Sequence, residues 1–161
     1  MTDHTLRRKV EALKREKLKS RKVVSLSDFR ELKSVIDTRT VLVVDDDEVM
    51  RSALKRILEA EGYKVMLAED GLELSKVLET TRLDLVLLDV CLPWVDGYEL
   101  CRLIKNHHSL KLVPLILVSG CKGKEDVDKG FAAGADDYVT KPFDIEYMLK
   151  VINKKLLQKH H

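Results

Sequence analysis

Three aspartates, one serine and one lysine in this sequence could together handle a phosphoryl group. The carboxylates belong to Asp45, Asp46 and Asp89, the hydroxyl to Ser119 and the ammonium group to Lys141. Carboxylates gathered at one place repel one another unless a cation joins them. Mg²⁺ or Mn²⁺ suits such a site, because these ions take oxygen ligands and are commonly completed by a phosphate. The lysine and the hydroxyl could each bind a phosphoryl oxygen, and Asp89 is the candidate nucleophile.

The elements that must position these residues are short apolar runs separated by amphipathic stretches. Five runs rich in Val, Leu and Ile predict buried strands at residues 41–44, 64–68, 83–88, 113–118 and 137–140. Five helices are predicted from apolar spacing, and Gly62 and Gly134 are placed to end the first and fourth of them. The residues that mark these helices are Val49, Ala53, Ile57 and Ala60; Leu72, Val77 and Leu78; Tyr98, Cys101 and Ile104; Val127, Phe131 and Ala135; Ile145, Leu149, Ile152 and Leu156.

Strands that alternate with helices predict an α/β fold with a parallel sheet covered on both faces. Ligands of such sheets bind at the carboxyl ends of the strands. The residues just past the first, third, fourth and fifth predicted strands are 45–47, Asp89, Ser119 and Lys141. We therefore expect these side chains to meet at one edge of the sheet.

Five segments in the same order and spacing resemble the receiver domain of the bacterial response-regulator family. They are VLVVDDDEVMR (41–51), LAEDG (67–71), DLVLLDVCLPWVDGYEL (84–100), LILVSG (115–120) and GADDYVTKPF (134–143). The resemblance covers about residues 40–157 and implies a flavodoxin-like, doubly wound sheet with strand order 2-1-3-4-5. It also implies a signalling module of a two-component phosphorelay, rather than an enzyme.

The resemblance assigns the carboxylates their roles. It implies that Asp89 accepts the phosphoryl group from a histidine kinase or a phosphotransfer protein. It further implies that Asp46 binds the metal directly and that Asp45 binds it directly or through water. Asp89 itself and the backbone carbonyl of Cys91 complete the protein's share of the metal ligands.

The resemblance also assigns the residues that respond to phosphorylation. Lys141 pairs with the phosphoryl group, and its bond to Pro142 is expected to be cis. Ser119 is the switching hydroxyl, Tyr138 the switching aromatic residue, and Gly120 the small residue that leaves room for the phosphoryl group. Ser119 would move to the phosphoryl oxygens, the ring of Tyr138 would enter the space, and the face of the fourth helix, fifth strand and fifth helix would repack to meet an output protein.

Other interpretations stay open for several residues. The Asp45–x–Asp47 spacing also fits a Mg²⁺-dependent phosphohydrolase that uses Asp45 as its nucleophile. We favour a helix N-cap or a solvated acid for Asp47. For Trp94, contact with a partner and packing of the loop are equally expected. Cys91 and Cys121 should edge the site, where we hypothesise that they tune the lifetime of the phosphoryl group.

The first part of the chain differs in charge from the rest. Residues 1–40 carry 12 Lys and Arg against 6 Asp and Glu, a net charge of +6, whereas residues 41–161 carry 17 against 21, a net charge of −4. We interpret residues 1–39 as a basic, helical extension or linker, 40–158 as the receiver domain and 159–161 as a tail. The extension could dock on a partner, form a dimer or serve as a tether; nucleic acid is disfavoured because a single aromatic residue, Phe29, lies among the basic ones.

Hydropathy and cysteine content bear on location. The longest uncharged run, 112–121, is too short to span a bilayer, and charges begin at Asp3, so no apolar signal peptide opens the sequence. The three cysteines are an odd number without CxxC spacing, which argues against a disulfide scaffold and a zinc site. We expect a cytoplasmic protein without a membrane span. No output domain follows residue 157 in this sequence, so we expect output through a protein partner or through residues 1–40.

Overall fold

The protein is represented by a computed structural model that describes residues 7–12, 15 and 38–158. The chain divides into two compact units, Met1–Thr38 and Arg39–His161. In the first unit, residues 7–12 and residue 15 are helical and mostly exposed. The remainder of the predicted helical extension and the tail at 159–161 lie outside the described residues.

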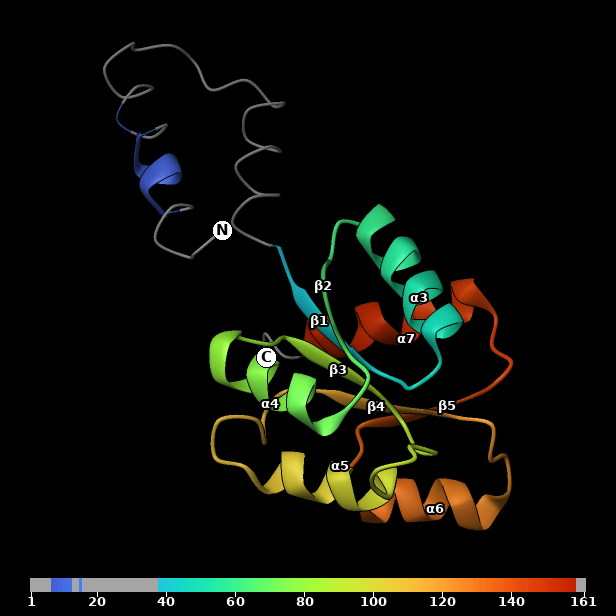
Figure 1. Cartoon of the computed structure of the whole chain (residues 1–161). Helices are drawn as coiled ribbons and strands as arrows, with labels where there is room; N and C mark the ends of the chain where they lie inside the picture. Colours follow the sequence, from blue (N-terminus) through green and yellow to red (C-terminus); the bar gives the residue numbers. More distant parts are fainter. Residues whose placement is uncertain (1–6, 13–14, 16–37, 159–161) are drawn as a thin grey trace. The chain divides into compact units, whose positions relative to one another are not determined.

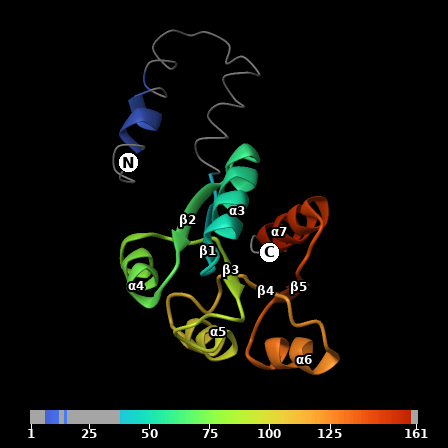
Figure 2. The same cartoon turned by 45° about the vertical axis from the view of Figure 1, so that its right-hand side comes forward.

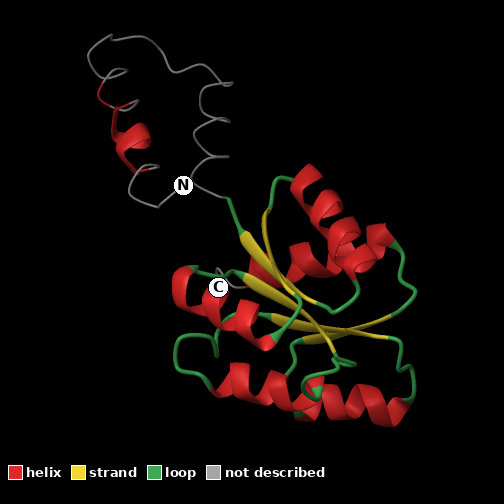
Figure 3. Ribbon diagram, viewed as in Figure 1, coloured by secondary structure: helices red, strands yellow, loops and turns green. Residues whose placement is uncertain are grey.

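The second unit is built on one parallel sheet of five strands (Figures 1 and 3). The strands are β1 (Thr40–Val44), β2 (Lys64–Ala68), β3 (Leu85–Asp89), β4 (Leu115–Ser119) and β5 (Asp137–Thr140). Their order, β2-β1-β3-β4-β5, confirms the predicted doubly wound topology. β1, β3 and β4 are buried along their whole length, as their continuous Val, Leu and Ile runs require.

Helices cover both faces of the sheet, as predicted (Figure 2). They are α3 (Glu48–Ala60), α4 (Gly71–Thr80), α5 (Gly97–Asn106), α6 (Lys124–Ala132) and α7 (Ile145–Gln158). α3 and α7 pack on one face, where Leu58 and Ile152 are fully buried. α4, α5 and α6 pack on the other, around Leu88, Cys101 and Leu117. The apolar side chains of the central strands are therefore covered by helices on both faces of the sheet.

β3 and β4 begin two residues later than their apolar runs. Leu83 and Val113 are buried but lie in loops. Pro114, directly before β4, has no N–H to donate, although its carbonyl accepts the N–H of Val86 at 2.9 Å. The apolar character of Leu83 and Val113 therefore reflects their burial and not pairing in a strand.

The inward faces of four helices differ from the prediction. Val49, Leu72, Phe131 and Ile145, which were chosen from the apolar spacing, are 77%, 67%, 48% and 47% exposed. α3 instead buries Arg51, Leu54 and Leu58. A buried arginine breaks the apolar stripe on which the prediction rested. The two helix-ending glycines, at 62 and 134, do have positive φ angles of 91° and 99°.

Candidate functional site

The central strands deliver two buried aspartates to the same edge of the sheet. Asp45 directly follows β1, and Asp89 is the last residue of β3. β1 and β3 pair in parallel up to the residue before each aspartate, so the two carboxylates leave the sheet side by side. β4 ends at Ser119, and Lys141 directly follows β5 at the same edge. The residues predicted to meet do so.

Three carboxylates form a cluster at this edge. One oxygen each from Asp45, Asp46 and Asp89 lies within 4.8 Å of the other two. Asp45 and Asp89 are only 3% and 6% exposed, whereas Asp46 faces solvent. A set of oxygen donors at this spacing, with one open side, fits a hard divalent cation such as Mg²⁺.

Lys141 joins the two buried carboxylates. Its ammonium group donates to Asp45 Oδ2 at 2.9 Å and to Asp89 Oδ2 at 3.4 Å. The second oxygen of each carboxylate accepts a backbone N–H, from Asp47 at 2.9 Å and from Cys91 at 3.1 Å. Both buried carboxylates are therefore held in place by hydrogen bonds to each oxygen.

The electrostatics of the site raise the pKa of Asp89 and keep Lys141 charged. Burial raises the pKa of this carboxyl above its ordinary value of 3.8, and the charge of Asp45 adds to the effect. The N–H of Cys91 and the ammonium group of Lys141 oppose the rise without cancelling it. Burial acts most strongly on the pKa of Lys141, which it lowers, but the contacts with Asp45 and Asp89 together raise that pKa. Lys141 therefore stays positively charged.

The raised pKa of Asp89 predicts how stability depends on pH. Well below pH 3.8 the carboxyl is neutral in the folded and unfolded chains, so burying it costs little. As the pH rises from 3.8 to the raised pKa, the unfolded chain loses this proton before the folded one, so the folded protein loses stability. We expect the free energy of unfolding of the wild type minus that of Asp89→Asn to fall over this range and then to level off. Urea unfolding with a chelator present measures it, and a pH-independent difference would contradict it.

The loop after β3 depends on a glycine that the sequence reasoning did not single out. A Cβ atom at Gly97 would lie 2.4 Å from Val90 Cα and 2.6 Å from the carbonyl oxygen of Asp89. The N–H of Gly97 donates to the carbonyl of Val90 at 2.9 Å, and Asp96 caps α5 by accepting the N–H of Tyr98. This turn fixes the backbone next to Asp89. The Asp-Gly pair before an amphipathic run was the available signal.

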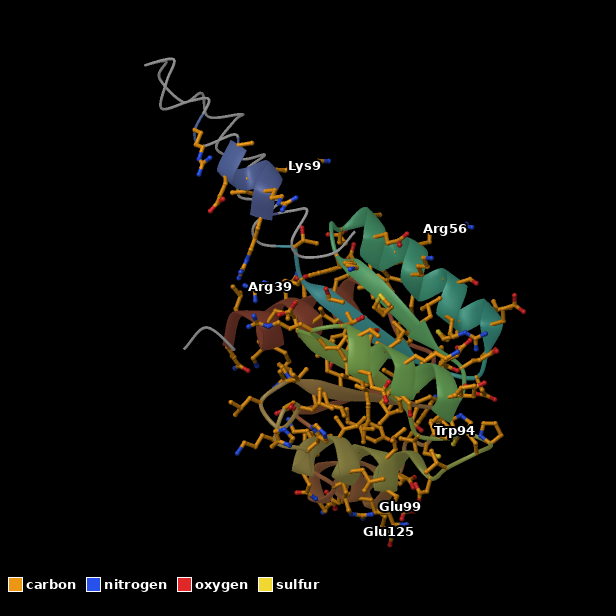
Figure 4. All side chains as sticks on the ribbon, turned by 60° about the vertical axis from the view of Figure 1, so that its left-hand side comes forward. Lys9, Arg39, Arg56, Trp94, Glu99 and Glu125 are labelled. Carbon is orange, nitrogen blue, oxygen red and sulfur yellow. The ribbon has the colours of Figure 1, made fainter. Side chains whose placement is uncertain are left out.

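Trp94 packs within the domain. Its indole N–H donates to the carbonyl of Glu69 at 3.1 Å, and its ring carbons lie 3.4 Å from the Cβ position of Gly71. The side chain stands at the outer edge of the loop, with 36% of the residue exposed (Figure 4). Of the two interpretations given to Trp94, loop packing is the one these contacts support.

Arg51 also supports the site and was missed. Its guanidinium donates to the carbonyl oxygen of Asp45 at 2.7 Å and to Glu69 at 3.0 Å. The residue is only 9% exposed, so it satisfies a backbone carbonyl that water does not reach. Arg51 is one of the buried residues of α3, which begins three residues after Asp45. In the sequence, Arg51 looks like any solvated charge on a helix, so nothing there indicates that it binds the backbone of Asp45.

The remaining predicted residues surround the same edge. Ser119 is fully buried, and its Oγ accepts the N–H of Cys121 at 3.0 Å. The ring of Tyr138 is buried, and its hydroxyl donates to the carbonyl of Cys121 at 2.8 Å. A Cβ atom at Gly120 would meet no atom within 4 Å, so space is open there. The Lys141–Pro142 bond is cis, as expected.

Two free thiols line a cavity of about 780 Å³ beside the site. Cys91 is exposed and Cys121 half-buried, and the other residues that line this open cavity are the rest of the loop 90–96, Tyr98, Arg102 and Lys129. Burial and the neighbouring Cys121 raise the pKa of the Cys91 thiol, which disfavours a reactive thiolate. The proximity of both thiols to the site is confirmed. Their effect on the lifetime of a phosphoryl group stays a prediction.

A model of the response regulator receiver domain matches residues 41–153, which is more than half of the chain. The chain belongs to this family. Its receiver domain is the kind of module that two-component systems use as a switch. In the part of the chain that the structure describes, no helix is long and apolar enough to cross a membrane.

Relatives and solved structures agree with this assignment. The chain is 45% identical to the transcriptional regulatory protein CseB of Streptomyces coelicolor over 108 residues, which cover 67% of this chain and 45% of CseB. It is 35% identical to protein PilG of Pseudomonas aeruginosa over 116 residues, 72% of this chain and 86% of PilG. The chemotaxis protein CheY4 of Vibrio cholerae matches with a TM-score of 0.67 at 30% identity, over 73% of this chain and 98% of CheY4. The chain thus spans less than half the length of CseB.

The phosphohydrolase interpretation is not favoured. It needs the carboxylate of Asp47 in the site, but Asp47 Oδ1 accepts the N–H groups of Val49 and Met50 at 2.9 and 3.3 Å. Asp47 is thus the N-cap of α3, as predicted, and the receiver family accounts for Asp89 and Tyr138, which a hydrolase leaves unexplained.

Proposed function

We propose that this receiver domain is a phosphorylation-dependent switch that carries the phosphoryl group on Asp89. The observation that carries the proposal is the placement of one lysine between two buried carboxylates, 2.9 Å from Asp45 and 3.4 Å from Asp89. The ammonium group of Lys141 thus lies in contact with the carboxylate of Asp89. The same ammonium group would pair with an oxygen of an incoming phosphoryl group.

The transfer is a displacement at phosphorus. An oxygen of Asp89 attacks, the new O–P bond forms, and the bond between phosphorus and the donor breaks; the donor leaves with that electron pair. Lys141 and the hydroxyl of Ser119 would stabilise the charge on the phosphoryl oxygens. Asp45, Asp46, Asp89 and the Cys91 carbonyl would hold Mg²⁺ or Mn²⁺, which screens the charge that develops during transfer.

Signalling, not turnover, is the proposed purpose. A phosphoryl group adds negative charge and acceptor oxygens at Asp89. Ser119 would turn from the N–H of Cys121 to these oxygens, and the face made of α6, β5 and α7 would take up the packing that an output protein prefers. The domain acts on its own phosphoryl group only, so we class it as a switch and not as an enzyme.

The proposed partners follow from the receiver family. A histidine kinase or a phosphotransfer protein supplies the phosphoryl group, and an output protein reads the α6, β5 and α7 face. Phe131, Ile145 and Tyr147 are 48%, 47% and 52% exposed, so α6 and α7 carry apolar side chains that a partner could contact. Dimerisation, the role of residues 1–39 and the cytoplasmic location stay predictions.

The proposal is tested by locating the adduct. Incubation of the full chain with acetyl phosphate and Mg²⁺ should add one phosphoryl group, seen by intact mass spectrometry. Borohydride reduction of the acyl phosphate followed by peptide mapping should place it on Asp89. An adduct on Asp45, or steady release of phosphate that depends on Asp45, would support the hydrolase instead.

Mg²⁺ is expected to stabilise the folded domain. A ligand that binds only the folded state at about ten times its Kd raises the free energy of unfolding by about 1.4 kcal/mol. Thermal unfolding with and without Mg²⁺ measures this gain. Asp46→Asn should lose most of it, whereas Asp47→Asn should keep it, because Asp47 lies outside the carboxylate cluster and asparagine is an equally good N-cap. Equal gains in wild type and Asp46→Asn would rule out the proposed ligand set.

A further inference from the structure

α6 contains a glycine where a helix would ordinarily favour alanine. Gly130 is buried in the helix, and glycine inside a helix lowers its stability relative to alanine. A Cβ atom there would lie 2.8 Å from Tyr138 Cδ2 and 2.9 Å from Leu117 Cδ1. Carbon atoms do not approach so closely without displacement. Because Gly130 has no side chain, the ring of Tyr138 fits against α6 at this position.

A second tyrosine contacts the same helix. Tyr98, on α5, is 9% exposed, and its hydroxyl donates to the carbonyl of Asp126 in α6 at 3.1 Å. Burial raises the pKa of Tyr98, and the nearby Tyr138 raises it further. Tyr98 contacts α6 through the carbonyl of Asp126, and the ring of Tyr138 contacts α6 at Gly130, so α6 connects α5 to β5.

We infer that Gly130 and Tyr98 are positioning residues for the switching tyrosine. Gly130 leaves the space for the ring of Tyr138, which we call its seat, and Tyr98 ties α5 to the helix that forms this seat. This inference rests on the proposed function for its link to phosphorylation. It adds α5 to the face of α6, β5 and α7 through which output is proposed. α5 also borders the cavity beside Asp89, so a partner on that side could read the switch as well.

The test uses ¹⁹F NMR of the full chain labelled with 3-fluorotyrosine. The chain has four tyrosines, and single Tyr→Phe variants assign their resonances. Gly130→Ala should move the Tyr138 resonance toward that of Tyr147, which is 52% exposed, with about a tenfold or larger loss of the buried population. Asp128→Ala is the matched control, because Asp128 is exposed on the same helix and the change favours the helix without adding a group near the ring.

Tyr98→Phe supplies a second variant, because it keeps the ring volume and removes only the hydroxyl. It should also shift the Tyr138 resonance, and circular dichroism shows whether each variant folds. If Gly130→Ala folds and leaves the Tyr138 resonance as it is in Asp128→Ala, the seat is disproved. If Gly130→Ala does not fold, Tyr98→Phe decides, and an unchanged Tyr138 resonance overturns the inference.

Acetyl phosphate and Mg²⁺ test the link to α5. The Tyr98 and Tyr138 resonances of the wild type should shift together as the adduct forms. If only the Tyr138 resonance shifts when the adduct forms, then α5 does not respond to phosphorylation. Absence of any adduct would count against the proposed function, while the effect of Gly130→Ala without phosphodonor would still test the seat.

Discussion

Asp89→Asn is expected to abolish adduct formation with acetyl phosphate, to below about one thousandth of the wild-type level. The amide has the same shape and can still accept the N–H of Cys91 through its oxygen, which lies at 3.1 Å in the wild type. It cannot act as an anionic nucleophile, and no other carboxylate in the cluster has the same position at the end of β3. Intact mass spectrometry after timed incubation measures the loss.

Asp47→Asn serves as the matched control for this result. It changes one aspartate to asparagine near the site but leaves Asp45, Asp46 and Asp89 in place. It should form the adduct at the wild-type rate, within about twofold. Persistence of the adduct in Asp89→Asn at a comparable level would transfer the phosphoacceptor role to Asp45 or Asp46.

Gly97→Ala is expected to lower the free energy of unfolding by about 3 kcal/mol or more. The new methyl group would stand 2.4 to 2.6 Å from three backbone atoms of Asp89 and Val90. Backbone atoms cannot rotate aside as the end of a flexible side chain does, so β3 and α5 must separate locally. Urea unfolding measures the loss, and the rate of adduct formation should fall as well, because the displaced segment includes Asp89.

Gly71→Ala is the control for glycine replacement. A Cβ atom at Gly71 would lie 3.4 Å from the ring of Trp94, which is an ordinary contact. The free energy of unfolding should change by less than about 1 kcal/mol. A loss in Gly97→Ala no larger than that in Gly71→Ala would show that the turn before α5 tolerates a side chain.

The site could be predicted from the sequence because its residues sit at fixed places in a regular topology. Val, Leu and Ile runs predicted the strands, and the rule that parallel strands end at one edge predicted that Asp45, Asp89 and Lys141 would meet. The 2.9 and 3.4 Å contacts of the lysine agree with that prediction. Here local sequence and global topology give the same answer.

Residues that depend on close contact between distant segments were not predictable in this way. The spacing of apolar residues favoured Val49 and Leu72 as core positions, yet both are exposed. Arg51 is buried because one carbonyl and one carboxylate are within its reach. The need for Gly130 arises only once β5 brings the ring of Tyr138 against α6. The roles of Arg51 and Gly130 depend on residues that are distant in the sequence, so the spacing of residue types along the chain does not predict them.

The contacts of Trp94 give this protein a built-in optical reporter. The indole is tied to the carbonyl of Glu69, whose carboxylate binds Arg51, and Arg51 in turn binds the backbone of Asp45. It is also the only tryptophan in the chain. Its emission therefore comes from one known place, in the loop after β3. We expect cation binding and phosphorylation to change that emission, so that both could be followed in real time with no dye attached to the protein.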